Sequence, residues 1–160
     1  MILLDTEALI WVDQDDDRLG AESRALISSA LDQQELCVST ISFWEIGWLV
    51  KKKRIDMQIG ISAWRNELLD AGIQEIPVNG LIGGAGEADN VEEYLATAGV
   101  AISDVASTLS SPRDELIASA PHLLVSLIVA TAIRLDSTVV TSDRVLLDWS
   151  GNVKTHDAGR

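Results

Sequence analysis

The strongest constraint on the fold is a set of short apolar runs separated by stretches with helical periodicity. The runs lie at residues 1–4, 36–38, 73–78 and 138–141, and a fifth strand is predicted at 152–155. Amphipathic helices are predicted between them, including those at 22–31, 40–52 and 61–71. Strands that alternate with helices form βαβ units, in which the strands lie parallel and helices cover both faces of the sheet. The pattern predicts a three-layer α/β/α fold with four or five parallel strands.

Size and composition indicate one domain in a reducing compartment. The 160 residues, 47% of them hydrophobic, are enough for a single core. The one cysteine, Cys37, cannot form an intrachain disulfide, and the N-terminus has no basic n-region, so we expect a cytoplasmic protein. Residues 116–133 just reach the length of a membrane span, but polar residues and Pro121 dilute them. We expect a core helix there and no membrane segment.

Three acidic residues stand close to the ends of predicted elements. Asp5 follows the first strand, Asp143 follows the fourth, and Glu45 lies in the helix after the second. The carboxyl ends of parallel strands form the edge where open α/β sheets bind ligands. Carboxylates that converge there repel one another unless a divalent cation binds them, and Mg²⁺ or Mn²⁺ prefers oxygen ligands. The pattern predicts such a metal site, suited to hydrolysis of a phosphodiester by a metal-activated water.

Each acid also has a local structural interpretation. Asp5 can cap the helix after it, Asp143 can cap the next turn, and Glu45 can pair with Lys51 or Lys52. If Glu45 points inward, Trp44 and Trp48 are its expected anchors. The acidic tract at 13–17 is predicted to be a solvated turn, because it lacks the central glycine and distal glutamate of an EF-hand loop.

The net charge of −13 argues against binding nucleic acid by broad neutralisation of phosphates. If the chain acts on nucleic acid, a metal and a local basic patch must supply the attraction. The candidate patch is the run Lys51, Lys52, Lys53 and Arg54. The alternative is that these cations only complement the dipole at a helix C-terminus.

Three groups of motifs surround these acids. They are the opening at 1–11, the segment 38–46 with the basic 52–55, and the segment 127–132 with 138–144. In order and spacing they resemble PIN-domain ribonucleases of the VapC toxin type, over residues 1–82 and about 126–157. The resemblance implies a single PIN-like domain at 1–160, Mg²⁺-dependent cleavage of RNA, a homodimer, and an antitoxin protein that blocks the active site.

The resemblance also implies roles for individual residues. Asp5, Glu45 and Asp143 carry over as metal-binding and catalytic acids. Thr6 and Thr141 carry over as supporting hydroxyls near the site.

One further acid of the family has no direct counterpart. Just before the helix near 126, the family has an aspartate where this chain has Val125, which cannot ligate a metal. Asp114, and more weakly Asp104, are candidate replacements as metal ligands, within a segment at about 83–124 that is longer than in the family. The alternative for Asp114 is an exposed residue at a helix N-terminus.

Three functions are compatible with these residues. The first is a metal-dependent RNA endonuclease, the toxin of a toxin–antitoxin pair. The second is a catalytically impaired PIN-like binding module, which Val125 favours. The third is a receiver-like or phosphatase-like domain with Asp5 as phosphoryl acceptor. The third ranks last because it needs a lysine at a later strand end, whereas the basic run lies at a helix end.

Overall fold

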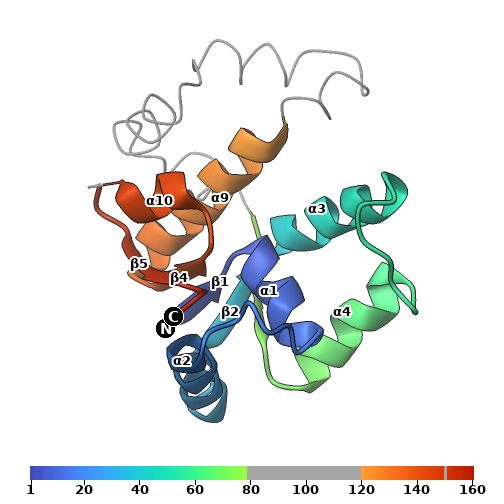
Figure 1. The fold of residues 1–160 in the computed structure, drawn as a ribbon, viewed down its shortest axis with the longest axis horizontal. Coiled ribbons are helices and arrows are strands. Elements are labelled where there is room, and N and C mark those ends of the chain that lie inside the picture. Colours follow the sequence, from blue (N-terminus) through green and yellow to red (C-terminus); the bar gives the residue numbers. More distant parts are fainter. Residues whose placement is uncertain (79–119, 150) are drawn as a thin grey trace.

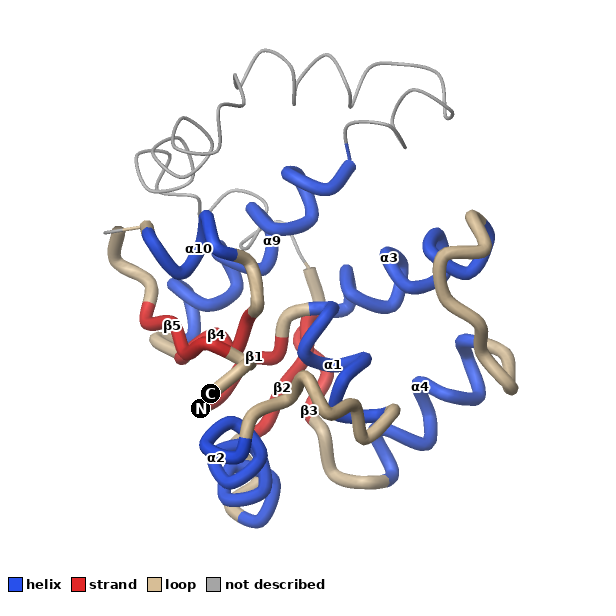
Figure 2. Tube along the Cα trace, viewed as in Figure 1, coloured by secondary structure: helices blue, strands red, loops and turns tan. Residues whose placement is uncertain are grey.

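The computed structural model describes residues 1–78, 120–149 and 151–160 (Figure 1). Its core is a five-stranded, all-parallel sheet in the order β3-β2-β1-β4-β5 (Figure 2). The strands are β1 (Ile2–Leu4), β2 (Leu36–Ser39), β3 (Gln74–Ile76), β4 (Thr138–Thr141) and β5 (Lys154–Asp157). The helices are α1 (Thr6–Asp13), α2 (Ala21–Asp32), α3 (Thr40–Lys51), α4 (Ile61–Asp70), α9 (Ala120–Leu135) and α10 (Arg144–Asp148). The predicted α/β class with a parallel sheet is confirmed.

The two faces of the sheet carry separate apolar clusters. Leu4, Val38 and Val140 pack in one cluster with side chains of α1, α2, α3 and α4. Leu3 and Val139 point to the opposite face, in a cluster with α9 and α10. Neighbouring residues of a strand face opposite sides, so each short apolar run supplies both clusters at once. This explains why the strands read as continuous apolar runs, and it gives the three layers.

The chain direction across the sheet changes between β1 and β4. From β1 the sheet extends through β2 to β3 on one side, and through β4 to β5 on the other. Leu4 pairs with Val140, and the Asp5 amide continues the ladder by donating to the Val140 carbonyl at 3.1 Å. Ligands bind at such switch points in open parallel sheets. Asp5 and the residues after Thr141 therefore emerge side by side at the position where a site is expected.

The apolar stretch before β4 is a core helix, as expected. Helix α9 buries Ile128, Val129 and Ala132 against the sheet. Within the described ranges, no helix combines the length and apolar character that crossing a membrane requires. The predicted insertion lies mostly outside these ranges, as do Asp104 and Asp114.

The last strand begins later than predicted, at Lys154 in place of Asn152. Trp149 is buried in the cluster of α9 and α10, and its indole lies against Gly151. A Cβ on Gly151 would approach the Trp149 ring to 2.2 Å. Gly151 therefore lies against the indole, and pairing with β4 begins only after it, at Lys154.

A candidate acidic site at the carboxyl edge of the sheet

Asp5 is the innermost of the predicted acids. It follows β1 directly, is 9% exposed, and its Oδ1 accepts a hydrogen bond from the Ala8 amide at 2.7 Å. Asp5 is thus the N-cap of α1, which was one of its two sequence interpretations. The cap fixes the carboxylate at the start of the helix, at the switch point of the sheet.

The surroundings of Asp5 disfavour its charged form. The pKa of the Asp5 carboxyl is raised from 3.8 to about 6, chiefly by burial; the negative charges of Glu7 and Glu45 also raise it, and hydrogen bonds from Thr141 and Ala8 lower it. The two neighbouring charges that act on Asp5 are therefore both of its own sign. A cation bound beside Asp5 would relieve this repulsion.

Glu45 reaches the same region from α3. Its Oε2 accepts a hydrogen bond from the Thr6 hydroxyl at 2.5 Å, which ties α3 to the first residue of α1. This is its observed hydrogen bond, and no ion pair of Glu45 with Lys51 or Lys52 is present in the described structure. Burial, together with the charge of Glu7, raises the pKa of the Glu45 carboxyl, and the Thr6 hydroxyl opposes that rise.

The prediction that Trp44 anchors Glu45 is wrong. Helix α3 buries Phe43 and Ile46, which lie three residues apart on one face. Trp44 is turned about 100° away from Phe43 by the helical repeat and is 44% exposed. Packing of α3 on its neighbours through the Phe43 face holds Glu45 at the site without Trp44.

Thr141 and Asp143 form the third part of the site, at the end of β4. The Thr141 hydroxyl accepts a hydrogen bond from the Asp143 amide at 3.0 Å, and the same side chain is hydrogen-bonded to Asp5. Asp143 Oδ1 accepts from the Val145 amide at 2.8 Å and caps α10. Thr141 thus links Asp5 with Asp143, and Thr6 links the start of α1 with Glu45.

A fourth acid, Glu7, lies beside these three and was not predicted. Its carboxylate accepts a hydrogen bond from the Ser142 hydroxyl, and its charge raises the pKa of both Asp5 and Glu45. Glu7 stands in the first turn of α1, where the helix dipole alone accounts for an acid. The sequence signal available was the spacing of two residues from Asp5, which means little without the contact to Ser142.

The donor set fits a hard divalent cation, although the carboxylates are not closed around a common point. Among the described residues, no three Asp, Glu, His or Cys side chains come together in a group that could hold an ion. Each carboxylate instead accepts a hydrogen bond from its own partner: the Ala8 amide, the Thr6 hydroxyl or the Val145 amide. The side chains at the site offer oxygen atoms, which suits Mg²⁺ or Mn²⁺ better than zinc.

The basic run at the end of α3 is fully on the surface. Lys51, Lys52, Lys53 and Arg54 are all exposed, and Lys52 Nζ and Arg54 Cζ lie 5.9 and 5.5 Å from the centre of the Trp48 ring. Cations held over an indole have fewer rotamers to lose on binding an anion. Their contact with RNA stays a prediction.

Val125 has a packing role in α9. Its side chain is partly buried against the cluster that contains Leu3 and Val139. The position at which the family resemblance implies an acid is therefore used for apolar contact.

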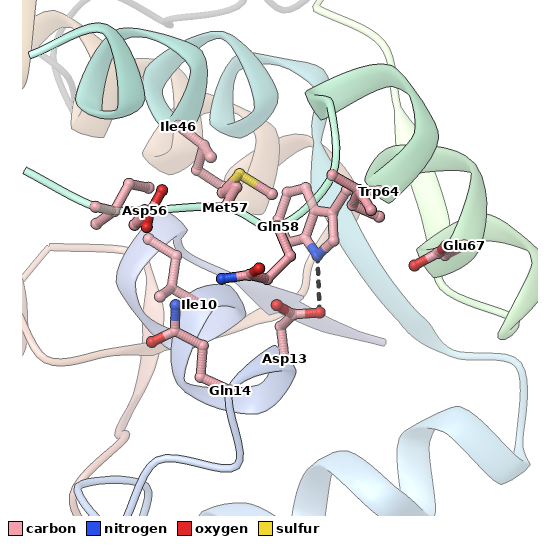
Figure 3. Close-up of a pocket in the computed structure, with 11 residues that line it drawn as sticks. Ile10, Asp13, Gln14, Ile46, Asp56, Met57, Gln58, Trp64 and Glu67 are labelled. Atoms are coloured by element: carbon pink, nitrogen blue, oxygen red, sulfur yellow. Dashed lines mark hydrogen bonds between the residues drawn. The ribbon is translucent and has the colours of Figure 1, made fainter. Parts of the chain in front are cut away.

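A separate cavity of about 470 Å³ lies between the C-terminal end of α1, helix α3, helix α4 and the loop that joins these last two (Figure 3). The Trp64 indole donates to Asp13 across it at 2.7 Å. Its lining residues are Ile10, Asp13, Gln14, Ile46, Ile55, Asp56, Met57, Gln58, Ile59, Trp64 and Glu67. None of the predicted catalytic acids lines this cavity, so it is distinct from the acidic site.

Comparison with known proteins agrees with this architecture. The model of the PIN domain matches residues 2–150. The chain is also 29% identical over 145 residues to Ribonuclease VapC22 of Mycobacterium tuberculosis (strain ATCC 25618 / H37Rv), a match that covers 91% of this chain and 88% of that protein. The match to the domain model runs from β1 to α10 and includes Asp5, Glu45 and Asp143. This chain belongs to the PIN-domain family.

Proposed function

We propose that the protein is a metal-dependent endoribonuclease and the toxin of a toxin–antitoxin pair. The observation that carries the proposal is the placement of Asp5, buried at the switch point of the sheet with Glu7 and Glu45 raising its pKa. A buried carboxylate flanked by like charges is characteristic of catalytic and metal-binding sites. Similarity to a protein named a ribonuclease supports RNA as the substrate.

Asp5, Glu45 and Asp143 are the residues that would hold Mg²⁺ or Mn²⁺, with Asp114 as a candidate fourth ligand outside the described residues. The ion, when bound, supplies a water of lowered pKa and stabilises the phosphoryl oxygens. The chain's own residues do the positioning: Thr6 holds the Glu45 carboxylate, and Thr141 bridges Asp5 and the Asp143 backbone.

The proposed partners are an RNA substrate, a cognate antitoxin protein and a second copy of the chain in a homodimer. The exposed run at residues 51–54 is the proposed contact with RNA phosphates outside the acidic site. Cations at the surface suit this role because the chain as a whole carries a charge of −13.

The direct test is cleavage of total RNA by the purified protein in Mg²⁺ or Mn²⁺ compared with EDTA. We expect cleavage with either metal and none in EDTA. Asp143→Asn should abolish cleavage and preserve the fold, because asparagine keeps the cap of α10. Asp70→Asn, which removes the same charge from the exposed end of α4, is the matched control and should cleave normally. Equal activity of wild type and Asp143→Asn would contradict the proposed site.

Val125 favours a second candidate, a catalytically impaired PIN-like binding module. This position of α9 carries an apolar side chain, packed against the cluster that contains Leu3 and Val139, in place of an acid. Under this alternative the wild type cleaves no RNA with either metal, and Val125→Asp creates metal binding or activity. RNA cleavage by the wild-type chain rules the alternative out.

A further inference from the structure

The acidic tract after α1 holds an arginine, and is more than a solvated turn. Asp16 Oδ1 accepts hydrogen bonds from the backbone amide and Nε of Arg18, at 2.9 and 3.0 Å, and its Oδ2 accepts from Nη2 at 2.6 Å. These contacts lower the pKa of the Asp16 carboxyl to about 2, so it stays ionised under physiological conditions. A carboxylate that binds both Nε and Nη2 fixes the plane of the guanidinium.

A contact with an aromatic ring and a second arginine that stabilises the loop keep Arg18 in place. Its Cζ lies 4.8 Å from the centre of the buried Trp11 ring. Arg24 braces the loop from α2, where its Nε donates to the Leu19 carbonyl at 3.0 Å and its Nη2 to the Asp16 carbonyl at 2.6 Å. The loop therefore holds the Arg18 side chain in one orientation before any ligand arrives, which lowers the entropic cost of binding.

The arginine stands next to the acidic site. Arg18 Nη1 lies 3.9 Å from Glu7, and the second oxygen of the Glu7 carboxylate accepts the Ser142 hydroxyl beside Asp143. The Arg18 and Glu7 side chains are 60% and 54% exposed. An ion pair this long and this exposed contributes little, so the guanidinium can exchange Glu7 for another anion. Arg18 is therefore an oriented, accessible cation, separated from the proposed metal ligand Asp143 only by Glu7 and Ser142.

We propose that Arg18 is a substrate-binding residue that holds a backbone phosphate of the RNA beside the acidic site. The inference rests on the proposed function, because it takes RNA as the ligand. A planar guanidinium matches the oxygens of a phosphate, and an acidic protein needs a local cation where a polyanion approaches its carboxylates. The Asp16 carboxylate then serves to position that cation.

The test compares wild type with Arg18→Ala in two assays. Cleavage of a single-stranded RNA in Mg²⁺ gives kcat and KM, and anisotropy of the same RNA in EDTA gives Kd over a series of salt concentrations. We expect KM and Kd to rise about tenfold at low salt, with a smaller change in kcat. Loss of one phosphate contact should also lower the salt slope of log Kd by about 0.7 for a single strand.

Matched variants separate binding from structure. Arg134→Ala removes an exposed arginine at the end of α9, which meets the sheet at its opposite edge, and should change neither Kd nor slope. Arg18→Lys should restore the slope but only part of the affinity, because lysine lacks the fork that Asp16 holds. Asp16→Asn should weaken RNA binding while the cation remains.

A double variant tests whether Arg18 acts only by offsetting Glu7. In that case Glu7→Gln would rescue Arg18→Ala, whereas direct phosphate binding predicts no rescue. Unchanged KM, Kd and slope in Arg18→Ala, or an equal loss in Arg134→Ala, overturns the assignment of Arg18 and leaves the proposed function intact. Wild-type protein that neither binds nor cleaves RNA overturns both.

Discussion

Asp5→Asn should stabilise the metal-free protein at neutral pH. The pKa of the Asp5 carboxyl is raised from 3.8 to about 6, chiefly by burial. At 1.36 kcal/mol for each tenfold change in proton affinity, keeping Asp5 ionised in the folded chain costs about 3 kcal/mol. Asparagine keeps an oxygen that can accept from the Ala8 amide, so the cap survives while the charge is removed.

The pH dependence has a definite sign. Below pH 3.8 Asp5 is protonated in the folded and the unfolded chain, so its charge costs nothing. As the pH rises from 3.8 to about 6, the unfolded chain ionises first, and wild type loses stability relative to Asp5→Asn. The difference between the two proteins should therefore be small at the acidic end, and reach its full value above the raised pKa.

Urea unfolding followed by tryptophan fluorescence in EDTA measures this difference, with Asp70→Asn as the exposed control. Saturating Mg²⁺ should then reverse the order, because it binds only the wild-type site. A ligand at 1,000 times its Kd adds about 4.1 kcal/mol to the folded state, which exceeds the cost of about 3 kcal/mol. The reasoning is refuted if Asp5→Asn is less stable than wild type in EDTA at neutral pH, or if the difference does not change with pH.

Three further predictions concern single contacts. Thr6→Val removes the donor to Glu45 and should lower RNA cleavage at least tenfold, while urea unfolding shows a loss of only about 1 kcal/mol, the value of one hydrogen bond. Gly20→Ala should destabilise the protein in thermal unfolding by about 1–3 kcal/mol, because the new Cβ would lie 1.9 Å from the Arg160 carbonyl oxygen. Leu146→Ala should cost about 2–5 kcal/mol in urea unfolding, because that side chain is fully buried in the α9 cluster.

The sheet and the positions of the acids could be predicted from the sequence because both depend on short-range patterns. A continuous apolar run such as the one ending at Leu4 indicates a strand covered on both faces, and Leu3 and Leu4 are indeed fully buried. The residue after such a strand must emerge at the carboxyl edge. Neighbouring positions of β1 and β4 then bring Asp5 and Asp143 to one place, which the chain order alone does not guarantee.

The remaining features depend on contacts between distant residues. Glu7 belongs to the site because Ser142 reaches it from the end of β4, 135 positions later. Arg18 belongs beside it because Trp11 and Asp16 fix the side chain, and an acidic tract alone gives no reason to expect a held cation. Side-chain direction on α3 likewise depends on which face of the helix packs, and the sequence alone does not show that Trp44 lies on the exposed face.

The local roles of the acids strengthen the case for a site. Asp5 and Asp143 both cap helices, and asparagine caps a helix about as well as aspartate does. A residue needed only as the cap of α1 would therefore be more favourable as asparagine, which is never ionised. The chain instead keeps a carboxylate whose ionisation costs about 3 kcal/mol, next to Glu7 and Glu45, which increase that cost. Capping does not explain the charge, whereas binding a divalent cation requires it. If Asp5→Asn retains full RNA cleavage, this argument fails, because the charge would then have no function.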